Sequence, residues 1–377
     1  MTFQPLQIVT RDPRSPAPRV ATWAGLDRLP DTVAATFRLI WLPFLTSRLA
    51  LFAVAWAVNL RFPYGRPNDP LVFEPAWRAW LAWDGLHYLR LANVGYPHWA
   101  SHPESGYPPL LPLLIHLLGG SAAAALALAF VGGLAGLGIL TGLTRAIFDE
   151  RVASRTAWVA AWWPLGFVWT AVYTEGLFLA LAAGALWAAW RSRALLAGAL
   201  SFLAATLRVT GVGLVLPLLA LLPAGWARLA ALAPVAGVLF FGGYQWYVTG
   251  DPLAFVHAQM AGRPHMHPLQ PFQALDHPGA GGGWELLVGL LALVLVVALI
   301  AVLVLEPRWR VASLAVVAGF LGPVLAAGTV FSLGRYAMVA FPLYWALQRA
   351  PTRFLVAAGV PAALLVTALA GNGRLTP

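Results

Sequence analysis

The chain has 377 residues, of which 60% are hydrophobic and 10% are charged. Soluble globular domains carry about 25% charged residues, so the composition excludes an ordinary soluble enzyme, a disordered protein and a secreted disulfide scaffold. Cysteine and lysine are absent, which excludes thiolate nucleophiles, cysteine zinc sites, the Walker P-loop and Schiff-base chemistry. All 24 basic residues are arginines at the ends of apolar runs, a pattern typical of membrane topology rather than of nucleic-acid binding.

Long apolar runs separated by short arginine-bearing connectors predict an all-α, polytopic transmembrane bundle of about eleven spans. The polar residues 1–33 predict a cytoplasmic tail, and residues 34–372 a single transmembrane domain. The apolar runs predict spans at 36–60, 121–147, 155–172, 175–190, 194–208, 211–224, 229–248, 284–305, 311–330, 336–348 and 353–370.

Two outer loops separate these spans. The first, 61–120, contains a Trp-rich amphipathic segment at 77–97, which predicts a helix lying at the membrane interface. It also contains the apolar segment 107–119, which is too short to cross and predicts a re-entrant or interfacial helix. The second loop, 249–283, is rich in Gly and Pro and is a candidate flexible lid.

The arginines also predict an orientation. With the N-terminus inside, the N-terminal tail and the inner connectors together hold 14 arginines, and the outer loops and outer span ends hold eight. This bias supports an orientation with the long loops outside the cytoplasm, and we expect the chain to lie in the plasma membrane. All eight histidines and most of the acids then lie on the outer side, so we expect an extracytoplasmic substrate.

Asp84 lies between Trp83 and Gly85 in the interfacial segment. One interpretation makes it the N-cap of a helix that begins at Gly85. The other makes it a base at the boundary between lipid and water, because Gly85 leaves room for a substrate to approach the carboxylate.

Three more charged residues fall at the predicted outer ends of spans. Glu175, at the tip of a hairpin, is either a loop or capping acid or part of the site. Arg208 lies in a deeply apolar stretch, where a cation is costly and is usually paired or functional. It either binds an anion or forms a structural pair with Glu175. Arg335 either binds an anion or anchors its span at the interface.

The sequence contains two less specific patterns, one for close helix packing and one for metal binding. The pairs Gly132/Gly136 and Gly138/Gly142 predict close packing inside the bundle. His265 and His267 form a lone His-x-His in a Pro-rich loop, short of the three or four ligands that a zinc site needs. We therefore expect neither a metal nor another cofactor.

The motif WDGLHYLRLANVGY, followed by YPPLLPLLIHLLG, resembles the opening signature of the PIG-V-like mannosyltransferases of the GT-C superfamily. In that family a W-D-[GA]-x-x-[FY] element precedes a G-Y pair and an [FY]-P-L-x-P-L-L run. Segments 173–211, 250–259 and 332–347 continue the resemblance in the family's order, over about residues 36–350. Because the compact, lysine-free chain lacks the lumenal insertions of eukaryotic members, it looks like a bacterial-type member.

The resemblance implies a GT-C-like bundle that transfers a sugar, mannose in this family, from a polyprenyl-phosphate donor on the extracytoplasmic side. The acceptor, which is a lipid, a glycan or a protein, is left open. Asp84 matches the family's expected catalytic base. The candidate substrate-binding residues are His87, Tyr88, Tyr107, Glu175, Arg208, His257, Arg335 and Tyr336.

The residue types fit this reaction. A polyprenyl phosphate leaves as a stabilised anion and needs no general acid, so transfer requires one base and cations for the phosphate. Asp84 supplies the carboxylate, Arg208 and Arg335 supply the cations, and displacement with a single base inverts the anomeric centre. The alternative is a transporter or a flippase for lipid-linked sugars, which would favour charge at a midplane site between two similar halves.

Overall fold

The computed structural model describes residues 29–61, 77–261, 307–326, 333–347 and 351–371. Helices are the regular structure throughout these ranges, which contain no strand, so the all-α prediction is confirmed. The first eight α-helices are α1 (Leu29–Arg61), α2 (Arg78–Leu81), α3 (Asp84–Val94), α4 (Leu110–Leu117), α5 (Ala122–Ile147), α6 (Glu150–Ala161), α7 (Glu175–Trp190) and α8 (Ala194–Leu207).

The remaining α-helices are α9 (Val215–Leu221), α10 (Ala233–Thr249), α11 (Ala254–Ala261), α14 (Pro307–Ala326), α15 (Leu333–Val339), α16 (Pro342–Ala346) and α17 (Thr352–Gly371). Short 3-10 helices connect several of them: η2 (Pro103–Gly106), η3 (Gly166–Trp169), η4 (Val209–Leu214) and η5 (Trp226–Leu232).

Four segments of the described chain are long and apolar enough to cross a membrane: Val33–Arg61, Ala122–Ile147, Trp226–Thr249 and Thr352–Ala370. Glu175–Trp190, Ala194–Leu207, Val209–Leu221 and Trp309–Val324 are apolar but shorter. The span expected at 284–305 lies outside the described residues, so the count of eleven stays a prediction.

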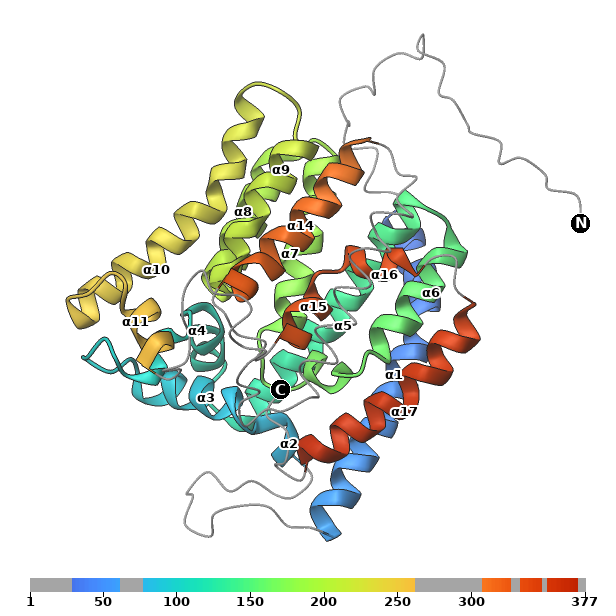
Figure 1. Cartoon of the computed structure of the whole chain (residues 1–377), viewed down its shortest axis with the longest axis horizontal. Helices are drawn as coiled ribbons and strands as arrows, with labels where there is room; N and C mark the ends of the chain where they lie inside the picture. The colour runs from blue at the N-terminus through green and yellow to red at the C-terminus, as the bar shows by residue number, and fades with distance from the viewer. Residues whose placement is uncertain (1–28, 62–76, 262–306, 327–332, 348–350, 372–377) are drawn as a thin grey trace, which may run out of the picture.

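The helices are arranged around a central group of α5, α7 and α8, which pack against one another in sequence order. α1 and α17 lie side by side on one flank, and α10 covers α8 on the other (Figure 1). The short helices α3, α4 and α11 gather at one end of the bundle, where η2 contacts α11 (Figure 1).

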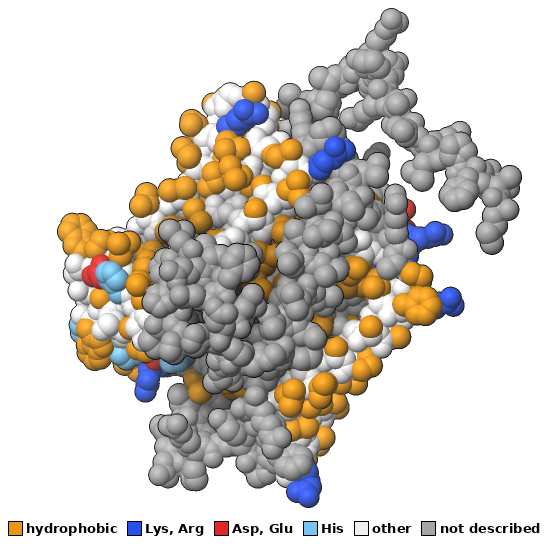
Figure 2. Space-filling view, viewed as in Figure 1, with side chains coloured by type: hydrophobic (Ala, Val, Ile, Leu, Met, Phe, Trp, Pro, Cys, Tyr) orange, Lys and Arg blue, Asp and Glu red, His pale blue; other side chains and the backbone are white. Residues whose placement is uncertain are grey.

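The outer surface is largely apolar. Figure 2 shows hydrophobic side chains over much of the visible described surface, with arginines near its margin. Along α10, the side chains of Leu239, Trp246 and Tyr247 are exposed to 69%, 66% and 88%. Contiguous exposed apolar surface is uncommon on soluble monomers and suits contact with lipid.

Glycines bring α5 and α7 into direct backbone contact. A Cβ added to Gly136 would lie 2.5 Å from the carbonyl oxygen of Gly176 in α7, and one added to Gly133 would lie 2.1 Å from that of Trp169 at the end of η3. One added to Gly132 would lie 2.6 Å from the side chain of Leu177. The predicted close packing within the bundle is therefore confirmed for this part of α5, and it fixes the start of α7.

The prediction of one continuous span at 155–172 is wrong. α6 ends at Ala161, and the chain turns through Pro164 into η3, because the residue before a proline avoids the helical region. The guanidinium of Arg48, buried in α1, closes this break by donating to the carbonyls of Gly166 (2.6 Å) and Ala161 (2.8 Å).

Three other predicted helices are also interrupted. The segment 336–348 divides into α15 and α16 around Pro342, and 211–224 begins in the 3-10 turn η4. The interfacial segment 77–97 breaks at Trp83 into α2 and α3. The segment 249–283, predicted to be an outer loop, contains the helix α11, and its remainder at 262–283 lies outside the described residues.

Candidate active site

Four charged side chains from four helices form a continuous chain of ion pairs, which we call the ionic cluster: Asp84, Glu175, Arg208 and Arg335. Arg208 Nη1 lies 2.5 Å from Glu175 Oε1. The same oxygen accepts from Arg335 Nε at 2.6 Å, and Arg335 Nη1 reaches Asp84 Oδ2 at 2.7 Å. The other Asp84 oxygen accepts from the Tyr107 hydroxyl at 3.0 Å. Two carboxylates thus balance two guanidiniums.

Asp84 is positioned by the break between α2 and α3. Trp83 adopts a φ of 53°, in the left-handed region that few non-glycine residues occupy, and α3 begins directly after it. The Trp80 carbonyl accepts from the Val172 amide at 2.8 Å, so the break is held against the segment that leads into α7. A Cβ on Gly85 would come within 3.3 Å of Val172. Asp84 therefore lies beside the start of α7.

The capping interpretation of Asp84 is wrong. α3 begins at Asp84 rather than at Gly85, its N-cap residue is Trp83, and no side chain caps its first turn. The Asp84 carboxylate instead faces Arg335 and Tyr107.

Glu175 and Arg208 meet because α7 and α8 form an antiparallel hairpin. Glu175 is the first residue of α7, and Arg208 is the C-cap of α8. α7 has 16 residues, which corresponds to about 24 Å, less than the about 30 Å of a hydrocarbon layer. The structure thus contains the pair that the sequence left as one of two interpretations of Arg208.

Aromatic rings cover both guanidiniums. The Arg335 guanidinium carbon lies 4.4 Å from the centre of the Tyr173 ring, and that of Arg208 lies 4.7 Å from the Tyr336 ring. Such contacts stabilise desolvated cations. Tyr336 was a predicted site residue, whereas Tyr173 was not, although it immediately precedes the Thr174–Glu175 pair in the sequence.

Tyr107 joins the ionic cluster to the first turn of α3. Its ring stacks on His87 at 5.1 Å and meets the edge of Tyr88 at 5.1 Å. Burial, together with the adjacent Asp84 carboxylate, raises the pKa of the Tyr107 hydroxyl, so this group stays protonated and donates to Asp84. Three predicted substrate-binding residues thus lie against one another.

A second charged cluster lies around Glu104 in η2, which was not among the predicted site residues. Its side chain is 5% exposed and lies 3.2 Å from His87 Nδ1 and 3.3 Å from Arg90 Nη1. His102 Nδ1 lies 3.8 Å away. The sequence shows Glu104 only as one of several acids in a polar loop, and its burial arises from the packing of η2 against α11.

His257 lies away from the ionic cluster. It projects from α11 and contacts Asp251 at 2.5 Å, with 52% of its side chain exposed. The Leu253 amide and His257 lower the pKa of the Asp251 carboxyl. No described contact joins His257 to the ionic cluster, so the structure does not bring this predicted site residue together with the others.

No group of three or more His, Asp or Glu side chains within the described ranges is placed to hold a metal ion. His265 and His267 lie outside those ranges.

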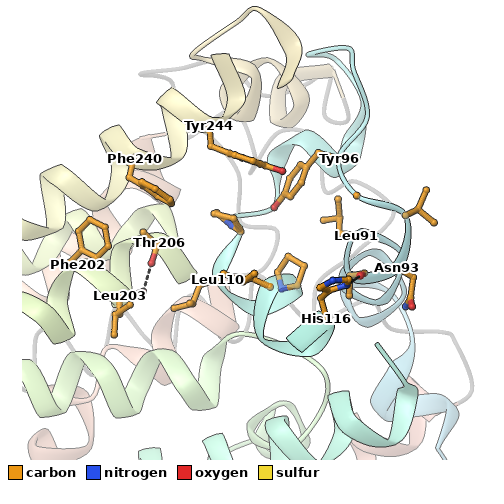
Figure 3. A pocket seen from close by; sticks show the side chains of 16 residues that line it. Leu91, Asn93, Tyr96, Leu110, His116, Phe202, Leu203, Thr206, Phe240 and Tyr244 are labelled. Atoms are coloured by element: carbon orange, nitrogen blue, oxygen red, sulfur yellow. Dashed lines mark hydrogen bonds between the residues drawn. The ribbon is translucent and has the colours of Figure 1, made fainter. Parts of the chain in front are cut away.

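An apolar cavity of about 600 Å³ lies at the end of α3 opposite Asp84. It is lined by the C-terminal half of α3 and by residues of α4, α8 and α10, including Phe202, Leu203 and Phe240 (Figure 3). α3 carries Asp84 at its other end, seven residues before Leu91, or about 10 Å along the helix axis. On α8, the lining residue Thr206 precedes Arg208 by two positions. The charged and apolar regions therefore share two helices.

The arrangement offers a partly exposed carboxylate, two guanidiniums and an apolar cavity at the other end of α3. Such a site can accept a proton from a substrate hydroxyl, balance an anionic group and hold an apolar chain. Of the nine predicted site residues, all but His257 belong to this connected group.

No model of a known protein family and no curated protein matches the chain. Crystal structures of the Archaeoglobus fulgidus oligosaccharyltransferase match it in backbone arrangement. The form tethered to an acceptor peptide containing the NVT sequon has a TM-score of 0.42 and 13% identity, and the complex with zinc and sulfate has 0.41 and 13%. Each match covers 86% of this chain and 55% or 52% of the archaeal chain, so the protein spans about half the length of that neighbour.

Proposed function

We propose that the chain is an integral-membrane, inverting glycosyltransferase of the GT-C type that uses a polyprenyl-phosphate sugar as donor. One observation carries the proposal: a partly exposed carboxylate, Asp84, is bound to a guanidinium at one end of α3, and an apolar cavity lies at the other end. Mannose is the sugar that the sequence resemblance favours.

Asp84 is the base in this proposal. Its side chain is 24% exposed, whereas that of Glu175 is fully buried. A substrate hydroxyl can therefore approach Asp84 but not Glu175. The Tyr107 hydroxyl and Arg335 each hold one oxygen of the Asp84 carboxylate, which fixes its plane while leaving further lone pairs for an acceptor proton.

Arg335 is the cation that meets the donor phosphate. Because the cluster is formally neutral, a phosphate must compete with carboxylates for the guanidiniums. Arg208 is bound to the fully buried Glu175 and to Thr174, whereas Arg335 also reaches the more exposed Asp84. We therefore expect the phosphate to contact Arg335 first and Arg208 to act mainly through Glu175.

The cavity holds isoprene units of the donor tail. Its walls are mainly aliphatic and aromatic side chains, and burying apolar chain in such a site is favourable by about 25 cal/mol per Å². The site is expected on the extracytoplasmic side of the plasma membrane, and the acceptor is a lipid, a glycan or a protein carrying a hydroxyl group.

The test is transfer by the purified protein reconstituted in liposomes with labelled polyprenyl-phosphate mannose. An extract of the source membrane supplies the acceptor, and Asp84→Asn is the matched control. We expect release of polyprenyl phosphate and label in new products, with both abolished in the control.

Movement of intact donor between leaflets without release of polyprenyl phosphate would instead support the flippase alternative. Release of polyprenyl phosphate from glucose or galactose donors, but not from the mannose donor, would support the glycosyltransferase activity and reject mannose as the sugar.

A further inference from the structure

Two tyrosines connect the apolar cavity to the Asp84 carboxylate. The Tyr107 hydroxyl donates to Asp84 Oδ1 at 3.0 Å, and the Tyr107 carbonyl accepts from the Tyr96 hydroxyl at 2.5 Å. Tyr96 lines the cavity, where its ring meets that of Tyr244 edge-on at 5.2 Å (Figure 3). The path from the cavity to Asp84 thus consists of two hydrogen bonds and the two tyrosine side chains that make them.

Tyr107 has few other backbone restraints. It lies between η2 and α4, and its amide donates to the Glu104 carbonyl at 3.2 Å. The bond from Tyr96 therefore restrains one side of this residue, and the rings of His87 and Tyr88 restrain the other. Burial raises the pKa of Tyr96, so its hydroxyl stays protonated and remains a donor.

We propose that Tyr107 is a positioning residue for Asp84 and that Tyr96 makes this positioning depend on an isoprenoid chain in the cavity. A chain packed against the Tyr96 ring holds the Tyr96 hydroxyl on the Tyr107 carbonyl, which keeps the Tyr107 hydroxyl on Asp84. With the cavity empty, the loop that carries Tyr96 and Tyr107 is less restrained, and the carboxylate loses a fixed orientation. The inference rests on the proposed function, since it assigns the cavity to the donor tail and proton transfer to Asp84.

The consequence is a split between kcat and KM. A tail that serves only as an anchor changes KM, because it stabilises the bound ground state and the transition state equally. A tail that also orients the base changes kcat. We expect a donor with a geranyl tail to have a lower kcat than one with a long polyprenyl tail, in addition to a higher KM.

The decisive variant is Tyr96→Phe, which keeps the ring and removes the hydroxyl. We expect its kcat with the long-tailed donor to fall about fivefold to tenfold, as loss of one hydrogen bond implies, with KM within about twofold of the wild-type value. Its kcat with the geranyl donor should stay unchanged. Tyr247→Phe is the matched control. Tyr247 lies one turn beyond the cavity residue Tyr244 on α10 and is 88% exposed, so this variant should behave as wild type. An equal loss with both donors, a rise in KM alone, or no change would overturn the inference.

A second measurement does not require turnover. Hydrogen exchange of the peptide containing Tyr107 is followed in nanodiscs with and without polyprenyl phosphate that carries no sugar. The amide of Tyr107 should become more protected on addition of the ligand in the wild type and in Tyr247→Phe, but not in Tyr96→Phe. Unchanged protection in the wild type would overturn the coupling even if the enzyme transfers sugar. Protection that rises as expected in a protein without transferase activity would keep the coupling and reject the proposed function.

Discussion

Asp84 and Glu175 share Arg335 yet occupy different environments. Asp84 is 24% exposed, contacts one arginine and also accepts from a tyrosine. Glu175 is 0% exposed and accepts from two arginines on one oxygen, while its other oxygen is buried and has no hydrogen-bond partner among the described residues. Two carboxylates in one cluster can thus have separate roles: the first is accessible to a substrate, and the second neutralises cations that could not otherwise stay buried.

The largest effect should follow from Asp84→Asn. Asparagine keeps the size of the side chain and can accept from Tyr107, but it cannot take a proton from an acceptor hydroxyl. We expect a loss of about 10²–10⁴ in kcat, the usual contribution of a general base. The measurement is transfer from the labelled donor by protein that inserts into the membrane at wild-type levels.

Glu104→Gln is the comparison for Asp84→Asn, because it also removes a negative charge from the first outer loop but outside the ionic cluster. It should reduce kcat far less. Near-normal turnover of Asp84→Asn would reverse the two roles and make Glu175 the leading candidate for the base.

Glu175→Gln should mainly lower stability. Removing one partner of a buried ion pair leaves uncompensated charge and typically costs about 3–5 kcal/mol. Here two guanidiniums lose their shared acceptor. We expect a lower midpoint of thermal unfolding in detergent. Adding Arg208→Gln should restore part of the loss, and a double variant less stable than either single variant would argue against the pair.

Arg335→Gln should impair transfer more than Arg208→Gln. Arg335 contacts both carboxylates, and we assign it to the donor phosphate, so losing a charge-assisted contact of about 1.5–3 kcal/mol should lower kcat/KM for the donor by about one to two decades. The acceptor KM should change less. If the two variants changed the donor kinetics equally, the assignment of the donor phosphate to Arg335 rather than to Arg208 would be rejected.

The smallest effect should come from His257→Ala. His257 pairs with Asp251 on the surface of α11 and has no described contact with the ionic cluster. We expect less than about twofold change in kcat/KM, in line with the small effects of exposed pairs. A loss comparable with that of Arg335→Gln would show that α11 reaches the substrate.

The sequence predicted the members of the site better than their connections. Asp84, Glu175, Arg208 and Arg335 each stand out as a charge in an apolar or aromatic context, and a pair between Arg208 and Glu175 was one open interpretation. Arg335 contacts Glu175, which lies 160 positions earlier in the sequence, and Asp84, which lies 251 positions earlier. No local sequence pattern specifies contacts over such separations. Glu104 and Tyr173 were missed because tertiary packing alone buries them.

The helix predictions also succeeded in some regions of the chain and failed in others. Long uniform runs such as α5 and α17 match their predicted ranges within a few residues. Two of the wrong predictions fail at a proline, Pro164 and Pro342, whereas the segment 77–97 breaks at Trp83 and 211–224 begins in η4 without one. Hydropathy averaged over a window registers neither kind of break, and proline chemistry explains only the first kind.

The Asp84–Arg335 contact also has a consequence for biosynthesis. Its two residues are separated by 251 positions, so Asp84, Glu175 and Arg208 are all synthesised before their last partner. Until α15 emerges, these three residues carry a net charge of −1 that must stay hydrated or be screened by lipid headgroups. A nascent chain truncated before residue 335 should therefore engage quality-control proteases more readily than one that extends beyond it, because the last helices of the protein complete a charge balance begun in the first loop.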